Sequence, residues 1–358
     1  MDILVLVLAF IVILAGAELF TNGIEWFGRK LELAEGAVGS VLAAVGTALP
    51  ETMIPIIAIL FASGASSHEV GVGAILGAPF MLSTLAMFVT GVAVLWAARR
   101  RPTGDRMLVD TGVLAHDMRY FGIAYAIAIG AAFLPVEPVW LKWIVAAILL
   151  GIYAWYVKGH FAAEAADGEG ASDLAPLRFH RLDRAAHQDD PGVPRLRIVN
   201  LQVLFALGLI VVGAAFFVDA VSHLATQLNV DSALLALVIA PIATELPEKF
   251  NSIIWVRQDK DTLAMGNITG AMVFQATIPT VVALVFASKT WVAAEGSYVA
   301  FASAGIAFLS SAFIFIPMAR RGVLHGKLLL IGGVFYLGYL ALVVGVVSGV
   351  LGGGTATH

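Results

Sequence analysis

Two short segments decide the fold of this chain: Thr-Ala-Leu-Pro-Glu at residues 47–51 and Thr-Glu-Leu-Pro-Glu at residues 244–248. Each places a proline and a carboxylate inside a long apolar stretch. A carboxylate at membrane depth is costly and by default marks a functional site. A proline there removes a helix hydrogen bond, which is tolerated where protein or a water-filled cavity surrounds the backbone. Two matched segments of this kind are typical of a transporter built from repeats.

The composition around these segments is that of a membrane protein. Of the 358 residues, 60% are hydrophobic and 13% are charged, and the mean hydropathy is +0.92. Repeated apolar runs of this kind indicate transmembrane helices. There is no cysteine, which excludes disulfides and thiolate-held metals or clusters. The first 20 residues carry Asp2 instead of a basic start, so we interpret them as a retained helix and not as a signal peptide.

Apolar runs bounded by charges or turn residues predict ten spans. The fourth of them is short for a bilayer, which needs about 20 residues. The predicted spans are residues 3–27, 36–62, 70–97, 120–135, 139–157, 199–225, 232–256, 262–287, 295–318 and 327–350.

One long polar segment, residues 160–197, separates the two sets of spans and has the composition of a linker. We therefore predict a first five-helix repeat at 1–157, a polar linker at 158–197, a second repeat at 198–351 and a short tail at 352–358. Five spans in each half make the halves run in opposite directions. The predicted fold is all-α and integral to the membrane, with ten transmembrane helices in two inverted five-helix repeats.

The basic residues predict the orientation of the chain. Loops opposite the N-terminus hold most of the Lys and Arg residues, whereas the N-terminal side holds Lys289 and Lys142. By the positive-inside rule the basic side is cytoplasmic. The protein is therefore predicted to be a multi-pass protein of the plasma membrane, with both termini outside and the 158–197 loop in the cytoplasm.

An internal repeat supports this layout. With a shift of 197 residues, Gly16–Phe20 falls on Gly213–Phe217 and the two Leu-Pro-Glu triplets coincide. With a shift of 193, Gly73–Ala78 falls on Gly266–Ala271. The Gly-x-x-x-Gly pattern in these segments allows close helix packing. Helix packing alone explains the glycines, but it does not explain why they follow Leu-Pro-Glu at nearly equal distances in both halves.

The repeat predicts a cation site at mid-membrane. An inverted pseudo-two-fold axis would make Glu51 and Glu248 face each other, with further oxygens from Thr47, Thr244 and Gln275. Such a set of oxygens suits a hard cation such as Ca²⁺, Na⁺ or Mn²⁺. For either glutamate alone, a structural hydrogen bond to a neighbouring helix is the alternative reading.

Three other charges lie in the predicted spans. Glu245 and Lys249 are four residues apart and could neutralise each other on one helix face. Alternatively, Glu245 is a third acidic ligand and Lys249 tunes the site. Glu18 has no counterpart in the second half, and we interpret it as a helix-packing or gating residue.

The histidines and the known enzyme motifs add no further site. The histidines are predicted to lie in loops or tails, or in one case near a helix end; they are His68, His116, His160, His180, His187, His223, His325 and His358. The chain has no His-Glu-x-x-His and no Walker A sequence, which argues against an intramembrane metalloprotease and an ATP-driven pump. The predicted carboxylates also lack a nucleophile or a histidine partner, so we do not expect an enzyme.

These segments resemble the two alpha-repeats of the cation/calcium exchanger superfamily, which includes sodium/calcium and calcium/proton exchangers. The family motif Gly-Thr-Ser-x-Pro-Glu is similar to residues 46–51 and 243–248. The motif Gly-Asn-x-x-Gly-Ser-Asn-x-x-Asn/Asp is similar to residues 73–82 and 266–275, so that its last position falls on Leu82 and Gln275. The resemblance implies ten helices in two inverted repeats and alternating-access exchange of a divalent cation for Na⁺ or H⁺. It also implies that Glu51 and Glu248 are cation ligands and that Thr47 and Thr244 line the site. Asn267 keeps a motif amide, and we assign it to tuning or gating.

The sequence also departs from the family motif. The motif serines are replaced, and the last amide of the first repeat is replaced by an apolar residue; the replacing residues are Ala48, Ala78, Leu82, Glu245 and Ala271. Because Ca²⁺ takes about six to eight oxygens, these changes leave the ion open.

We therefore predict a secondary antiporter of Ca²⁺ or a similar divalent cation against H⁺ or Na⁺. Its partners are small inorganic cations and the lipid bilayer, with no nucleic acid and no cofactor apart from the transported ions, and its oligomeric state is open. The alternatives are a carrier of monovalent cations or of another small solute, and a non-transporting membrane sensor or scaffold.

Overall fold

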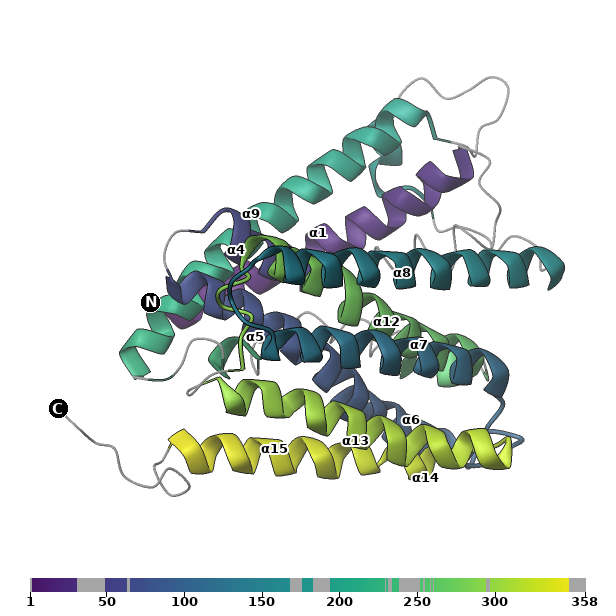
Figure 1. Ribbon diagram of the computed structural model, residues 1–358. Helices are drawn as coiled ribbons and strands as arrows, with labels where there is room; N and C mark the ends of the chain where they lie inside the picture. Colours follow the sequence, from purple (N-terminus) through teal and green to yellow (C-terminus); the bar gives the residue numbers. More distant parts are fainter. Residues whose placement is uncertain are drawn as a thin grey trace.

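The computed structural model describes most of the chain, and almost all of the described part is helical (Figure 1). The described residues are 2–30, 49–62, 65–167, 176–182, 194–228, 230, 234–237, 252–253, 255–257, 259, 261–293 and 297–347.

The α-helices of the described residues are α1 (Asp2–Lys30), α4 (Leu49–Leu60), α5 (Ala65–Met81), α6 (Met87–Ala97), α7 (Thr111–Gly130), α8 (Trp140–Asp167), α9 (Leu196–Leu228), α12 (Asp261–Phe286), α13 (Tyr298–Arg321), α14 (Gly326–Leu329) and α15 (Ile331–Val347). A π-helical turn, Leu82–Ala86, joins α5 to α6, and short 3₁₀ turns lie at Ala131–Phe133 and Arg178–Leu182. Two short strands, β1 (Arg106–Met107) and β2 (Leu324–His325), pair in antiparallel register.

Seven helical segments in the described residues are long and apolar enough to cross a bilayer. Large apolar side chains also cover the outside, as in α1 with Leu4 at 62% exposure and α15 with Val334 at 72%. An apolar exterior of this extent requires a lipid environment. The prediction of an all-α membrane protein is therefore confirmed.

The fourth predicted span differs most from the structure. Its helix, α7, begins at Thr111 and ends at Gly130 instead of covering 120–135. Asp110 caps α7 by accepting hydrogen bonds from the backbone N–H groups of Gly112 and Val113. The first turns of α7 are polar, which hid them from a search for apolar runs. Polar helix turns also explain an error about the histidines. His68, His116 and His160 are predicted to lie in loops or tails, but they lie in α5, α7 and α8.

Other predicted spans extend beyond the described residues. Of the second span, 36–62, the structure describes α4 from Leu49 onwards. Of the seventh, 232–256, it describes 234–237, 252–253 and 255–256.

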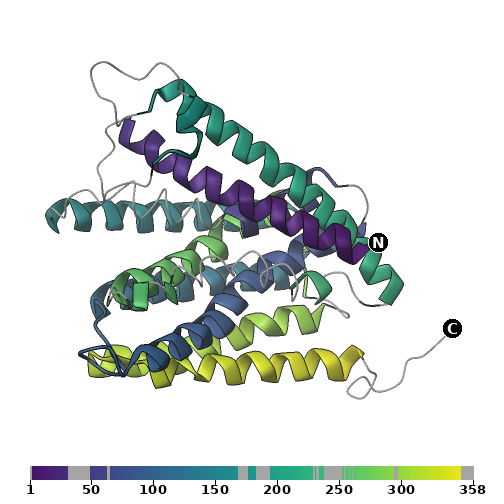
Figure 2. The ribbon, with the colours of Figure 1, turned by 180° about the vertical axis from the view of Figure 1, so that it is seen from behind.

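Helices α1 and α9 lie side by side and form the upper layer in Figures 1 and 2. Their contact is close because it is built on small residues. A Cβ atom added to Gly16 of α1 would lie 2.8 Å from Ile210 Cγ1 of α9, and one added to Gly23 would lie 2.8 Å from Val203 Cγ2. Since the partner number falls as the glycine number rises, the two helices are antiparallel.

The remaining long helices form a larger body below this layer (Figure 1). Its core is formed by buried residues of α5, α6, α7, α8, α12, α13 and α15. Helix α12 packs against α4, α5, α7 and α8, and thus lies where the helices of the first half of the chain meet. The β1–β2 ladder joins the loop after α6 to the turn after α13 at one end of this body.

Candidate cation site

Glu51, the first of the two repeated glutamates, is buried in the protein. It lies in the first turn of α4 and is 5% exposed. The same helix buries Ile54, Ile57 and Ala58 in an apolar cluster with Phe217 of α9. A buried carboxylate on an apolar helix marks a candidate functional site.

Gln275 supplies a second buried polar side chain on a helix that contacts α4. It lies near the middle of α12 and is 2% exposed. Helix α12 packs against both α4 and α5. The fold therefore brings together a helix with a buried carboxylate and a helix with a buried amide, one from each half of the chain.

A proline follows each of these two residues at the same distance. Pro55 lies four residues after Glu51 within α4, and Pro279 lies four residues after Gln275 within α12. A proline has no N–H and so removes the helical hydrogen bond to the carbonyl four residues earlier. The backbone carbonyls of Glu51 and Gln275 thus lie outside the regular hydrogen-bond ladder of their helices.

The residue that corresponds to Gln275 in the first half has a different environment. It is Leu82, which is 3% exposed and begins the π-helical turn between α5 and α6. Ser310 of α13 donates a hydrogen bond to the carbonyl of Ser83 in this turn, at 2.6 Å. Gly332 of α15 packs directly on the carbonyl of Thr84. Two backbone oxygens of the turn are therefore occupied by the packing of α13 and α15.

Several predicted site residues lie outside the described residues. These are Thr47, Thr244, Glu245, Glu248 and Lys249. The pairing of Glu51 with Glu248 and the pairing of Glu245 with Lys249 therefore stay predictions. Within the described part of the chain, no three His, Asp or Glu side chains lie close enough to hold a metal ion.

The two other predicted residues in the described part of the chain are Asn267 and Glu18. Asn267 is half-buried near the first third of α12. Glu18 is exposed on α1, and its carboxylate forms an ion pair with Arg178 of the segment 176–182 at 2.6 Å. Glu18 therefore contacts the polar linker region and not an apolar helix face.

Sequence reasoning missed a set of polar contacts along α12, and the first lies at its N-terminal end. Arg101 and Asp261 form a buried ion pair, and Arg101 also donates to the carbonyl of Val256 at 3.1 Å. The backbone N–H of Leu108 donates to the Asp261 carboxylate at 2.7 Å. This pair attaches the loop after α6 to the start of α12.

The second contact lies further along the helix. Asp117 of α7 is 1% exposed and accepts hydrogen bonds from Thr269 of α12 at 2.6 Å and from Tyr156 of α8 at 3.1 Å. A buried carboxylate is stable when such donors replace its hydration. Asp117 thereby joins three helices.

The third contact lies at the other end of α12. Lys142 of α8 is fully buried, and its ammonium donates to the carbonyls of Ser288 at 2.5 Å and Trp291 at 2.8 Å. The indole N–H of Trp291 in turn donates to the carbonyl of Ala128 at 3.0 Å. The predicted span 120–135 leaves out Asp117, whereas the predicted span 139–157 includes Lys142 but gives it no role. A charged residue in or beside an apolar run is the signal in the sequence that could have indicated both.

With this geometry in place, comparison with known proteins identifies the family. The family model described as sodium/calcium exchanger protein matches residues 1–159 and 199–348. The chain belongs to the sodium/calcium exchanger protein family. The match is interrupted between residues 159 and 199, at the polar segment between the two matched parts.

Two curated relatives of this exchanger-family chain are membrane proteins. Inner membrane protein YrbG of Escherichia coli (strain K12) is 27% identical over 246 residues, which cover 67% of this chain and 66% of that protein. This match spans just under two thirds of the relative. The uncharacterized membrane protein MJ0091 of Methanocaldococcus jannaschii is 22% identical over 266 residues, or 74% of this chain and 75% of that protein.

Solved exchanger structures share the fold. The H⁺/Ca²⁺ exchanger CAX matches 98% of this chain and 85% of its own, with a TM-score of 0.69 and 16% identity. The sodium-calcium exchanger NCX_Mj, soaked with 2.5 mM Na⁺ and 0.1 mM Ca²⁺, matches 95% of this chain and 97% of its own, with a TM-score of 0.54 and 17% identity. The exchanger family thus supports a cation antiporter in a membrane.

Proposed function

We propose that this protein is a secondary antiporter that exchanges a divalent cation, Ca²⁺ or a similar ion, for H⁺ or Na⁺ by alternating access. The observation that carries the proposal is the buried carboxylate of Glu51 on α4, a helix that packs against α12, which carries the buried Gln275. A buried carboxylate needs a cation, a proton or hydrogen-bond donors to be stable in an apolar interior. In this proposal a transported cation or a coupling proton binds the Glu51 carboxylate and leaves it again in each transport cycle.

In this proposal Glu51 and Glu248 are the central ligands, one from each repeat. Thr47, Thr244, Gln275 and Glu245 add oxygens, and hard cations prefer an oxygen shell of this kind. Lys249, Asn267 and Glu18 tune or gate the site, and the ion pair of Glu18 with Arg178 would connect such gating to the linker. No resident cofactor and no enzymatic reaction are proposed.

The contact between α1 and α9 supports two inverted five-helix repeats and ten spans. A Cβ atom added to Gly16 would meet Ile210 and the carbonyl of Ala206, and one added to Gly213 would meet Ile13 and the carbonyl of Ala9. Gly16 and Gly213, Ile13 and Ile210, and Ala9 and Ala206 are each separated by the same 197 residues. Such a reciprocal exchange of partners is what a two-fold axis between equivalent helices produces.

The second shift of the internal repeat has a structural counterpart as well. The hydroxyl of Thr84 donates to the carbonyl of Phe80, and the hydroxyl of Thr277 donates to the carbonyl of Val273. Thr84 and Thr277, and Phe80 and Val273, are each separated by 193 residues. Equivalent positions of the two halves therefore repeat a local hydrogen bond in a buried helix.

The domain limits and the orientation follow from the same proposal. The proposed repeats occupy 1–157 and 198–351, and both termini lie outside the plasma membrane. The proposed linker, 158–197, lies in the cytoplasm; its first ten residues continue α8 to Asp167, and α9 begins at Leu196 within it. Arg106 lies in β1, and Arg321 ends α13 shortly before β2. Both therefore lie at the end of the molecule that holds the β1–β2 ladder, which the positive-inside rule assigns to the cytoplasm.

Flux in proteoliposomes tests the proposal. Protein reconstituted into vesicles loaded with Ca²⁺ should release it when an inward H⁺ or Na⁺ gradient is imposed, and Glu51→Gln should reduce that flux at least tenfold. Glu137→Gln is the matched control, because Glu137 is exposed in the turn before α8, and it should leave flux unchanged. Competition of Mn²⁺, Mg²⁺ or K⁺ with the Ca²⁺ flux shows whether the protein selects divalent or monovalent cations.

Two outcomes would contradict the proposal. Flux of a monovalent cation alone, insensitive to Ca²⁺, would indicate a monovalent carrier. If no cation gradient drove flux and Glu51→Gln left cation binding unchanged, the protein would be a sensor or scaffold and not an antiporter.

A further inference from the structure

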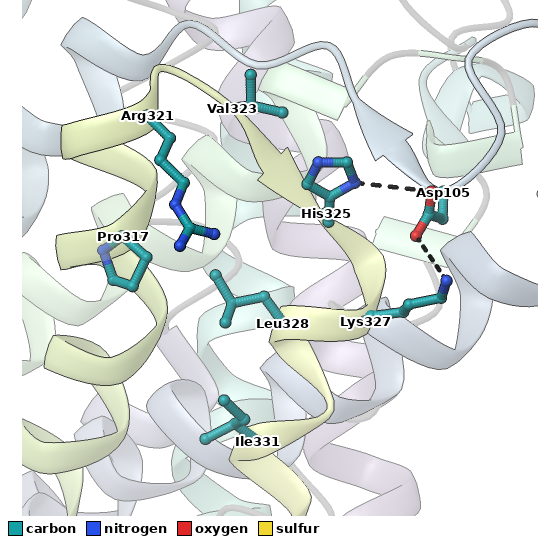
Figure 3. Close-up of a pocket in the computed structure, with 8 residues that line it drawn as sticks. All are labelled: Asp105, Pro317, Arg321, Val323, His325, Lys327, Leu328 and Ile331. Atoms are coloured by element: carbon teal, nitrogen blue, oxygen red, sulfur yellow. Dashed lines mark ion pairs between the residues drawn. The ribbon is translucent and has the colours of Figure 1, made fainter.

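A cationic pocket lies at the end of the molecule where α13 turns into α15, away from Glu51 and Gln275. Its cavity measures about 580 Å³ and has an apolar wall and a polar rim (Figure 3). The apolar wall is formed by Pro317, Val323, Leu328 and Ile331. The rim carries Arg321, His325 and Lys327, with Asp105 beside them.

The rim has a positive balance. The Asp105 carboxylate forms ion pairs with Lys327 Nζ at 3.5 Å and with His325 Nδ1 at 3.6 Å. Arg321 has no ion pair with any side chain in the described part of the chain, and Figure 3 shows its guanidinium directed into the space above Leu328. Asp105 therefore pairs with Lys327 and His325, and the guanidinium of Arg321 is left without a carboxylate among the residues that line the pocket, which favours an anion.

The backbone around the pocket is fixed in place. Gly326 donates a hydrogen bond to the carbonyl of Asp105 at 2.8 Å, and His325 pairs with Arg106 in the β1–β2 ladder. Gly326 also packs so closely on Val94 of α6 that a Cβ atom would lie 2.6 Å from its side chain. Preorganised groups of this kind bind a ligand without a large ordering cost.

The pocket opens beside a surface that faces lipid. Val334 and Leu337 of α15 are 72% and 65% exposed, and Phe313 and Ile316 of α13 are 55% and 48% exposed. These residues continue the apolar wall of the pocket along the outside of the two helices. A ligand that fits both parts has an anionic head and an apolar tail.

We propose that this pocket binds the phosphate headgroup of an anionic phospholipid, with an acyl chain along α13 and α15. Arg321 and Lys327 hold the phosphate, since guanidinium and ammonium groups donate charge-assisted hydrogen bonds to phosphate oxygens. Basic pockets between transmembrane helices recognise anionic headgroups in this way. The proposal is independent of the transported ion, because no residue of the pocket belongs to the proposed cation site.

Native mass spectrometry of the purified full chain tests the proposal. The probes are phosphatidylglycerol, phosphatidylcholine and inorganic phosphate, each added to delipidated protein in detergent. Wild-type protein should bind one phosphatidylglycerol in preference to phosphatidylcholine. Arg321→Ala should weaken that binding about fivefold and Arg321→Ala/Lys327→Ala about 30-fold, since each basic residue at a lipid surface contributes about 1 kcal/mol.

Two variants keep the test specific. Arg320→Ala is the matched control, because Arg320 lies in the same last turn of α13 and does not line the pocket; binding should stay at the wild-type level. Arg321→Lys should keep most of the binding, which shows that a variant with the charge retained folds and binds.

The proposal is overturned by any of three results. Arg321→Ala/Lys327→Ala could bind phosphatidylglycerol like wild type, or Arg320→Ala could lose as much as Arg321→Ala. Finally, inorganic phosphate at millimolar concentration could displace the lipid completely, which would make free phosphate, and not a lipid headgroup, the ligand of this pocket.

Discussion

The α1–α9 pair and helix α12 are held in the bundle by different physical means. The middle of the α1–α9 contact is apolar and depends on glycines that let two backbones approach. Helix α12 is attached at both ends and near its first third by buried charges and hydrogen bonds. Close packing of small residues is the main source of helix association where lipid removes the hydrophobic driving force. Buried polar contacts are instead directional, and each must break before the helix can shift.

The two kinds of contact hold their helices with different specificity. The helix that carries Gln275 is tied to α7, α8 and the loop after α6 by specific partners. The α1–α9 pair has polar contacts at one end, where Gln202 donates to Asn22 at 3.0 Å and to the carbonyl of Leu19 at 2.8 Å. The predictions below separate directional contacts from small-residue packing, and each is measured as a free energy of unfolding in mixed micelles titrated with SDS.

The largest effect is expected from breaking the buried ion pair at the start of α12. Arg101→Ala leaves the Asp261 carboxylate buried without its cation, and such a loss costs about 3–5 kcal/mol. Arg100→Ala should change the free energy of unfolding by less than about 0.5 kcal/mol, since Arg100 is exposed. Equal effects of the two substitutions would show that the ion pair does not hold α12.

A smaller loss is expected at the opposite end of α12. Lys142→Met removes the ammonium that binds the carbonyls of Ser288 and Trp291, and leaving them buried without this donor costs about 1–3 kcal/mol. The control is Lys289→Met, because Lys289 is exposed in the same turn. A stability of Lys142→Met at or above the wild-type value would mean that desolvation of the ammonium outweighs its hydrogen bonds.

The α1–α9 pair should respond to added volume. Gly213→Ala places a methyl group 2.7 Å from Ile13 and 3.1 Å from the carbonyl of Ala9, and overpacking of this kind costs about 1–3 kcal/mol. Gly208→Ala in the same helix meets no atom within 4 Å, so it should be neutral or stabilising by up to about 1 kcal/mol.

Gly16→Ala extends this test to the symmetry of the pair. Because Gly16 has the equivalent contacts, its substitution should cost nearly as much as that of Gly213. A difference of more than about 1 kcal/mol between the two would argue against the reciprocal contact.

The smallest effect is expected at the hydrogen bond between Thr269 and Asp117. Thr269→Val removes one donor to the buried carboxylate, and interhelical hydrogen bonds in membranes contribute about 0.6 kcal/mol on average and up to about 1.7 kcal/mol. Thr277→Val removes a hydroxyl that bonds within its own helix, so it should cost less. If Thr277→Val were the more destabilising of the two, the Asp117 contact would not help to hold α12.

Much of the fold could be predicted from the sequence because apolar runs report which segments can be buried in lipid. The predicted span 262–287 and the observed α12, Asp261–Phe286, agree closely. The prediction was wrong for the start of α7 because Asp117 and its polar neighbours have low hydropathy. Inside the protein, however, Tyr156 and Thr269 replace the water around that carboxylate, and these partners are distant in sequence.

Composition is enough to identify a membrane protein from the sequence, and repeated spacing predicts two related halves and two glutamates in apolar surroundings. The three buried polar contacts of α12, and the cavity that Arg321 lines and Arg320 does not, become visible only once the helices are packed. The physical reason is that a charge in an apolar chain is tolerated or not according to its partners. Those partners come together when helices pack, and no local pattern in the sequence specifies them.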